Sequence, residues 1–349
     1  MNLDSIDELR RLDSSDMLSL MAKTPDRLVA PQNADTTCDL KVDHLDNVLF
    51  IGMGGSGIAG DILTDCARDV ASVPLGILRG LRLPAYVGKR TLCIAISYSG
   101  ETHETNTLLE QATKREAKIG VISSGGRLLA KAQQTGFPYL RIPSGMPPRV
   151  ALPELIAASV FMLSHASVFE DAARMLSEAR SAVADRIETI KPQTSLEKNS
   201  AKQLAQVLVD RLPLIIGVEE DGSVLRRFKN ELNENSKMPA FYYVVPEAFH
   251  DDVEGLKALK TLANVQTVFL RNENWLAAQG GAQQRLADLL EELGFSRAVE
   301  FGGQGQGRLS QLLTSVVFAD YVSVYLAALR GVDPSELNVI PGFRKVMRS

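Results

Sequence analysis

Residues 49–61 read Leu-Phe-Ile-Gly-Met-Gly-Gly-Ser-Gly-Ile-Ala-Gly-Asp, an apolar run that leads into a loop of glycines and one serine. The unbroken apolar run predicts a buried β-strand, and the residues after the loop predict a helix over 58–67. Gly52, Gly54 and Gly57 fit the G-x-G-x-x-G pattern, in which backbone N–H groups at a helix start face a phosphate. A tight turn between strand and helix, without any ligand, is the simpler interpretation of the same glycines.

A second stretch, residues 94–102, repeats this arrangement with hydroxyl side chains and reads Ile-Ala-Ile-Ser-Tyr-Ser-Gly-Glu-Thr. Ser97, Ser99 and Thr102 follow a predicted strand, and ligands of parallel sheets usually bind at the carboxyl ends of the strands. The simpler interpretation is that Ser99 caps the helix expected over 103–114, which is compatible with anion binding. Two such loops in one α/β unit can hold an anion from both sides, so they predict a site for a phosphorylated small molecule.

The first loop, taken alone, also suggests a dinucleotide site. Such a site needs an acidic residue about 20 positions further on, which binds the ribose at the end of the second strand. The second predicted strand, residues 75–78, is followed by Arg79 and carries no carboxylate. Because Arg79 could face a 2′-phosphate, a nicotinamide-dependent oxidoreductase is weakened as an interpretation but not eliminated.

The rest of the chain predicts an α/β fold with two domains, residues 1–152 and 153–349. In the first domain, strands alternate with helices, which is typical of a parallel sheet covered on both faces. A segment rich in proline and glycine, residues 143–149, ends this series, and a long helical connector is expected over 153–190. A second α/β series follows, with strands expected at 214–218, 241–245 and 265–270 and helices at 224–233, 275–293 and 309–329.

Composition and charge indicate what kind of protein this is and which partners it is not expected to bind. With 45% hydrophobic and 23% charged residues, the chain has the composition of a soluble globular protein, and a net charge of −4 argues against a nucleic-acid partner. We expect no membrane partner, because no apolar run is expected to reach the roughly 18 residues of a membrane span. Cys38, Cys66 and Cys93 are widely spaced, which predicts neither a disulfide framework nor a metal site. We therefore expect a cytoplasmic protein.

Two residues of the second half can supply acid–base chemistry. Glu234 closes a predicted helix within the run Asn-Glu-Asn-Ser-Lys, and His250 follows in a loop. A carboxylate and an imidazole that converge on one cleft can act as general base and general acid. On spacing alone, a surface glutamate and a loop histidine without any catalytic role are the simpler interpretation.

In combination, these residues resemble the bifunctional phosphoglucose/phosphomannose isomerases of the sugar isomerase (SIS) superfamily. The resemblance extends from residues 13–17 through both loops to residues 326–334, and the segments of Glu234 and His250 are its most specific parts. It implies two SIS-type domains, each a mostly parallel sheet flanked by helices. It also implies a homodimer that interconverts aldose and ketose 6-phosphates without a cofactor or a metal.

The resemblance further implies a role for each site residue. Arg149 would stabilise the enediolate, Glu234 would move a proton between C1 and C2, and His250 from the adjacent subunit would help to open the sugar ring. A family lysine near the C-terminus corresponds to Arg344 by strict spacing and to Lys345 after a shift of one residue. The remaining residues would bind the phosphate and the sugar: Ser56, Ser97, Ser99, Thr102, Gly54, Gly55 and Pro148.

Two functions of different classes stay open beside the dinucleotide interpretation. The first is an aldose–ketose isomerase for glucose 6-phosphate, with mannose 6-phosphate as a second substrate. The second is a non-catalytic SIS module that senses a sugar phosphate and regulates a partner. The sensor would keep the two loops but would have no need for Glu234 or His250, and both are present.

Overall fold

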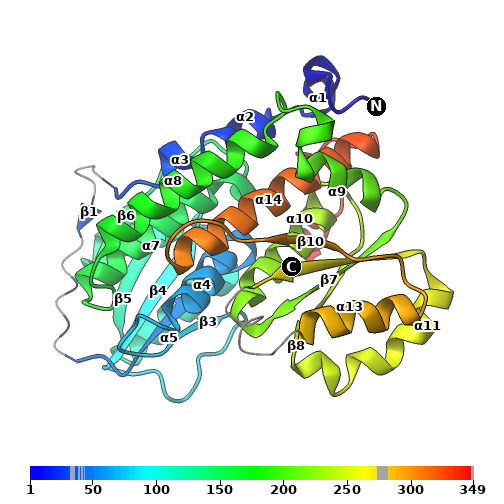
Figure 1. The fold of residues 1–349 in the computed structure, drawn as a ribbon. Helices are drawn as coiled ribbons and strands as arrows, with labels where there is room; N and C mark the ends of the chain where they lie inside the picture. The colour runs from blue at the N-terminus through cyan, green and yellow to red at the C-terminus, as the bar shows by residue number, and fades with distance from the viewer. Residues whose placement is uncertain (32–35, 38–39, 41, 43, 273–281, 347–349) are drawn as a thin grey trace. The chain divides into compact units, whose positions relative to one another are not determined.

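The computed structural model describes the chain except residues 32–35, 38–39, 41, 43, 273–281 and 347–349, and Figure 1 draws its elements. Two compact units are present. The six-stranded unit comprises Lys23–Ala184 and Gly305–Leu312, and the four-stranded unit comprises Met1–Ala22, Asp185–Gln304 and Leu313–Ser349. This division differs from a boundary at residue 152, because much of the helical connector belongs with the first sheet and the beginning of the chain belongs with the second.

The six-stranded unit has the strand order β1-β6-β5-β4-β2-β3, and all neighbours are parallel except β1 and β6. The strands are β1 Thr36–Thr37, β2 Asn47–Ile51, β3 Leu75–Leu78, β4 Thr91–Ser97, β5 Lys118–Ser123 and β6 Tyr139–Arg141. The helices are α3 Thr24–Arg27, α4 Gly54–Ala67, α5 His103–Lys114, α6 Gly126–Thr135, the 3₁₀ helix η1 Pro148–Ala151 and α7 Leu152–His165, followed by α8 Ala172–Ile190, which continues into the other unit. The alternation of strands and helices predicted for this part of the chain is confirmed.

Helices cover both faces of this sheet. Alternate side chains of β2, β4 and β5, such as Leu49 and Cys93, pack with α5 and α6 in one apolar cluster. On the opposite face, α4 lies so close that a Cβ at Gly60 would come within 2.8 Å of Phe50 Cβ, and a Cβ at Gly120 would overlap Met162 of α7. The sheet is therefore a buried middle layer, as expected for parallel strands.

The predicted connector over 153–190 is two helices rather than one. Helix α7 ends before Ser167, which adopts a positive φ of 55°. Helix α8 then starts directly after Asp171, whose Oδ1 accepts the backbone N–H of Arg174 at 3.1 Å. A left-handed residue after one helix and an acidic cap before the next are ordinary helix boundaries, although the alanine-rich composition concealed them.

The four-stranded unit has the strand order β10-β9-β7-β8, with all neighbours parallel. The strands are β7 Leu212–Val218, β8 Phe241–Val245, β9 Val265–Arg271 and β10 Val299–Gly302. The helices are α1 Ile6–Leu12, α2 Met17–Ala22, η2 Leu196–Lys198, α9 Ser200–Leu208, η3 Glu219–Asp221, α10 Gly222–Glu234, η4 Glu247–Phe249, η5 Asp252–Gly255, α11 Leu256–Leu262, α13 Ala282–Glu292, α14 Arg308–Leu329, which begins in the other unit, and α15 Ile340–Val346. The helix predicted over 275–293 is seen as α13, and residues 275–281 lie outside the described residues.

Among the described residues, α14 is long and apolar enough to cross a membrane by length and composition alone, although Asp320 interrupts its apolar run. An 18-residue window of this 22-residue helix has a mean hydropathy of 1.8. However, 89% of that window is buried inside the protein. Its side chains pack in the core, where Phe318 stacks on Phe301 of β10 at a centroid distance of 4.9 Å. By its burial, α14 is a core helix.

A buried lysine fastens the beginning of the chain to the four-stranded unit. Lys202 of α9 is fully buried. Its Nζ donates to Asp4 Oδ1 and to the carbonyl oxygen of Pro192, each at 2.8 Å, and to that of Thr194 at 2.9 Å. Asp4 Oδ1 also accepts the backbone N–H of Leu196 at 2.9 Å. All three ammonium donors are therefore used.

We expect Lys202→Met to lower the free energy of unfolding by about 2 kcal/mol, because two partly buried carbonyl oxygens lose their donor. The exposed Lys198→Met is the control, and urea unfolding is the measurement. The hydrogen bond from Lys202 also holds the pKa of Asp4 below its ordinary value of 3.8. This contribution is complete above pH 3.8 and is lost as the pH falls through the lower pKa of the folded state. Equal stability of the two variants would contradict the assignment.

Candidate functional site

The first glycine loop is shorter than predicted, because α4 begins at Gly54 rather than at residue 58. The glycines of this loop therefore form the first helical turn, although glycine disfavours helices in isolation. Met53 occupies the N-cap position, and no side chain that the structure describes caps the helix. The N–H groups of this first turn thus keep the capacity to bind an anion. A Cβ at Gly54 would meet no described atom within 4 Å, so the turn faces open space.

The second loop connects β4 to α5 and is held by its own hydroxyl groups. Ser97 Oγ shares a 2.8 Å hydrogen bond with Thr102 Oγ1 and accepts the N–H of Gly100 at 3.1 Å. Ser97 is buried, Thr102 is half-buried and Ser99 is exposed. Thr102, rather than Ser99, is the N-cap residue of α5. The hydroxyl groups of Ser99 and Thr102 are therefore more accessible than that of Ser97, which is buried inside the loop.

The two loops lie side by side, as their sequence pattern predicted. Strands β2 and β4 are neighbours in the sheet, so the loops emerge from the same edge. The backbone N–H of Tyr98 donates to Ser56 Oγ at 3.3 Å. This hydrogen bond joins the first turn of α4 directly to the second loop.

A third loop, which the sequence analysis did not assign to the site, supports the second. It follows β5 and contains Ser124 and Gly125. The N–H of Ser124 donates to the carbonyl oxygen of Tyr98 at 3.1 Å. Gly100 has a positive φ of 71°, and a Cβ at this position would overlap the carbonyl oxygen of Gly125. The run Ser-Ser-Gly-Gly after a predicted strand was the signal that could have revealed this loop.

Pro148 and Arg149 lie next to the two loops. They open η1, and Arg149 is only 5% exposed. A Cβ at Gly55 would lie 3.4 Å from the carbonyl oxygen of Pro148, so this segment borders the first loop. The N–H of Met146 donates to the hydroxyl of Tyr98 at 2.9 Å, which ties the segment to the second loop as well. One unit thus gathers both loops and the Pro148–Arg149 pair.

Arg27 of α3 holds η1 from another direction. Its Nη1 donates to the carbonyl oxygen of Val150 at 2.7 Å and pairs with Glu154 Oε1 at 3.2 Å. Burial raises the pKa of Glu154, and Arg27 opposes that rise. The pair is largely shielded from water, so it restrains the segment next to Arg149 more than an exposed pair would.

Glu234 and His250 both lie in the four-stranded unit, near opposite ends of strand β8. Glu234 is the last residue of α10, one residue beyond the helix predicted over 224–233, and His250 is exposed in the loop after η4. Since β7 and β8 are parallel, α10 runs back along the sheet and ends near the start of β8. His250 follows the end of β8, which spans about 13 Å. One chain therefore does not bring the two side chains into one cleft.

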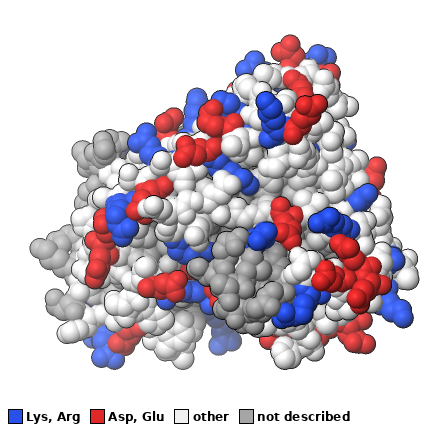
Figure 2. All heavy atoms as spheres, viewed as in Figure 1, with Lys and Arg blue, Asp and Glu red and all other residues white. Residues whose placement is uncertain are grey.

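The C-terminal candidates lie in α15, which includes both Arg344 and Lys345. Their side chains lie outside the described part of the chain. Among the described residues, no group of three His, Cys, Asp or Glu side chains could hold a metal ion. On the face drawn in Figure 2, Lys and Arg are interspersed with Asp and Glu, and no broad basic area stands out.

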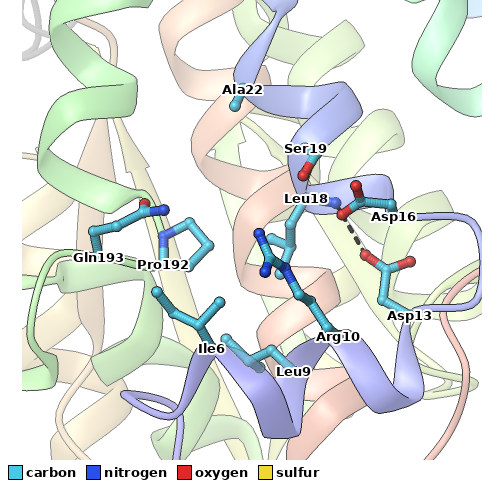
Figure 3. A pocket seen from close by; sticks show the side chains of 10 residues that line it. All are labelled: Ile6, Leu9, Arg10, Asp13, Asp16, Leu18, Ser19, Ala22, Pro192 and Gln193. Carbon is cyan, nitrogen blue, oxygen red and sulfur yellow. Dashed lines mark hydrogen bonds between the residues drawn. The ribbon is translucent and has the colours of Figure 1, made fainter.

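A small pocket lies in the four-stranded unit, and none of the predicted site residues is among the described residues that line it. It has a volume of about 70 Å³ and lies between α1, α2 and the segment at Pro192. Figure 3 shows Arg10 between Pro192 and Asp13. One carboxylate oxygen of Asp13 accepts the N–H of Leu18 at 3.0 Å, and burial raises the pKa of this carboxyl group.

Comparisons with known proteins show which family this chain resembles. Residues 81–145 match the SIS domain, and residues 197–347 match the bacterial phospho-glucose isomerase C-terminal SIS domain. A bifunctional phosphoglucose/phosphomannose isomerase of Caldicellulosiruptor bescii is 31% identical over 303 residues, which cover 86% of this chain and 89% of the relative. The protein of the same name from Thermoplasma volcanium is 30% identical, covering 87% and 92%.

The fold has matches among solved structures. A glucose-6-phosphate isomerase like protein from Thermus thermophilus aligns with a TM-score of 0.64 over 99% of both chains, at 17% identity, which supports the fold alone. The two matched SIS regions fall on the two parallel sheets, so the predicted fold class is confirmed. Since the sequence similarity to the two named relatives spans most of both proteins, the chain belongs to the bifunctional phosphoglucose/phosphomannose isomerase family.

Proposed function

We propose that this protein interconverts glucose 6-phosphate and fructose 6-phosphate through an enediolate, with mannose 6-phosphate as a second substrate. One observation carries the proposal. The hydrogen bond from Tyr98 N–H to Ser56 Oγ joins two glycine and hydroxyl loops at one edge of a parallel sheet, beside Pro148 and Arg149. Such an edge suits a phosphorylated ligand, and relatives over most of the chain are named bifunctional phosphoglucose/phosphomannose isomerases.

The phosphate group would sit between the first turns of α4 and α5. Neither helix has a side-chain cap among the described residues, so backbone N–H groups and the positive ends of two helix dipoles are available to an anion. Ser99 and Thr102 would add hydroxyl donors, while the buried Ser56 and Ser97 would keep the loops in place. The open space beside Gly54 would then receive the sugar, and Gly55, next to Pro148, would line it.

Glu234 would transfer the proton, and Arg149 would stabilise the enediolate. The C2 proton of an aldose is weakly acidic, so the site must stabilise an enediolate while a carboxylate takes the proton. A positioned guanidinium in a water-poor site can contribute about 3 kcal/mol to that stabilisation, and the burial of Arg149 supports this role. Glucose and mannose 6-phosphates differ only at C2, which becomes planar in the enediolate. One base could therefore serve both epimers.

Ring opening would need a second subunit. Within one chain, Glu234 and His250 lie near opposite ends of strand β8. This separation supports a homodimer in which His250 of the partner subunit completes the site. Lys345 would assist ring opening, and Arg344 is the alternative. Because arginine stays protonated in proteins, Arg344 could donate a hydrogen bond but could not shuttle a proton.

A cytoplasmic location belongs to the same proposal. Cys66 and Cys93 are free and buried. Burial raises the pKa of each thiol to about 12, so neither forms a reactive thiolate at neutral pH. Free, unreactive cysteines are compatible with a reducing compartment.

We expect purified protein to convert fructose 6-phosphate into both glucose 6-phosphate and mannose 6-phosphate without an added metal. Separate coupled assays for the two products are the measurement, and a sample treated with a chelator should be equally active. Binding of fructose 6-phosphate without either product would favour the sensing module instead. Absence of both binding and turnover would contradict the phosphate site itself.

A further inference from the structure

The helix that ends at Glu234 contributes Arg227 and Glu231 to a buried ion triad, whose third member is Asp320 of α14. Arg227 is 2% exposed. Its Nε and Nη2 donate to the two carboxylate oxygens of Asp320 on α14, each at 2.9 Å, and its Nη1 pairs with Glu231 Oε1 at 2.8 Å. Burial by itself lowers the pKa of Arg227, but Asp320 and Glu231 outweigh that effect and raise it. The triad therefore holds a cation between two carboxylates.

The triad is linked to the residue that directly follows Glu234. Asn235 is fully buried, and its Nδ2 donates to the second carboxylate oxygen of Glu231 and to Ser323 Oγ, each at 2.9 Å. Ser323 Oγ in turn donates to the carbonyl oxygen of Asp320 at 2.7 Å. Glu234 thus lies between two residues, Glu231 and Asn235, that one network holds against α14.

The chain beyond the helix is held in the same way. Ser236 Oγ donates to the carbonyl oxygen of Ser323 at 2.6 Å, and Arg330 Nε donates to the carbonyl oxygen of Ser236 at 3.0 Å. Lys237 Nζ donates to the carbonyl oxygen of Asn235 at 3.2 Å. The donors on Lys237 and Arg330 satisfy carbonyl groups just beyond the end of α10, where intrahelical partners are absent, and Ser236 Oγ ties the same segment to α14. The last turn of α10 is therefore fixed from both sides.

Stability alone does not explain this arrangement. Burying three charges is costly, because their attraction repays the lost hydration only in part, and apolar residues of similar volume often stabilise a core as well. We propose that the triad of Arg227, Glu231 and Asp320, with Asn235, positions the Glu234 carboxylate for proton transfer, a role that rests on the function proposed above. Terminal turns open readily, and a displacement of a catalytic group by 1 Å costs about 10²-fold in rate.

The test is to cut the link and keep the triad. Asn235→Ala removes the connection between Glu231 and the residue after Glu234. We expect kcat with fructose 6-phosphate to fall at least ~10-fold and KM to stay within about twofold, because the phosphate loops belong to the other unit. Ser323→Ala breaks the same connection from α14, so the double variant should be no slower than the slower single variant.

Lys202→Met is the matched control, because it also removes a buried polar network of the four-stranded unit and its hydrogen-bond partners lie outside α10. At matched losses of thermal stability, Lys202→Met should keep its kcat and Asn235→Ala should not. Equal kcat values for the two variants would overturn the positioning role alone. A wild-type protein that binds fructose 6-phosphate without turning it over would overturn the proposed function, and the positioning role with it.

Discussion

Glu234→Gln is expected to lower kcat for fructose 6-phosphate at least ~10²-fold, the lower range for loss of a general base. Glutamine keeps the shape and the hydrogen-bonding capacity of the side chain but cannot accept the C2 proton. Glu234 is half-buried at the end of α10, and the phosphate loops lie in the six-stranded unit. Binding of the sugar phosphate should therefore persist. Steady-state kinetics combined with isothermal titration of fructose 6-phosphate would separate the two properties.

The exposed Glu254→Gln removes a carboxylate from the same unit and serves as the control. It should leave kcat within about twofold of wild type, as expected for a surface substitution. Near-normal turnover in Glu234→Gln would remove Glu234 from the mechanism. Loss of sugar phosphate binding in that variant would instead assign Glu234 to the binding of the ground state.

Gly100→Ala should destabilise the protein by about 3 kcal/mol, through overpacking and backbone strain. Gly100 has a positive φ, and its new methyl group would overlap the backbone carbonyl of Gly125, which cannot move as a side chain would. The second loop, which connects β4 to α5, would have to shift. We therefore also expect KM for fructose 6-phosphate to rise at least ~10-fold, a loss of about 1.4 kcal/mol of binding free energy. Thermal unfolding and kinetics measure the two effects.

Gly125→Ala provides a control on the opposite side of the same contact. A Cβ at Gly125 would meet no described atom within 4 Å, and its φ of 167° is extended backbone that any residue adopts. Gly125→Ala should therefore change stability by less than about 0.5 kcal/mol. If Gly100→Ala were equally mild, the close approach of the second and third loops would be wrong.

Elements bounded by abrupt changes of polarity were predicted residue by residue. Strand β3, helix α5 and strand β8 have the ends expected from the residue order. The two strands are short runs without charged residues, the buried residues of α5 recur at helix spacing, and polar or turn residues follow each element directly. Local chemistry is sufficient there, because the same residues that form the element also end it.

Elements whose ends depend on packing were predicted less well. Helix α4 starts inside a run of glycines, where intrinsic propensity predicts a loop. The close approach of α4 to β2 needs a glycine at Gly60, so the sheet determines where this helix lies. The short β10 escaped prediction because it has four residues, of which only Phe301 is buried and Glu300 is exposed.

The residue order alone predicted that the glycine loop and the loop of hydroxyl residues lie at one edge of the sheet, because parallel strands place their carboxyl ends together. It could not place Glu234 and His250 relative to each other, since that depends on the direction of α10 across the sheet. It also gave no sign of the triad. Arg227 and Glu231 are four residues apart and resemble an exposed helical ion pair. Packing against α14 buries that pair beside Asp320, 93 positions later, because long-range contacts decide which charges lose their water.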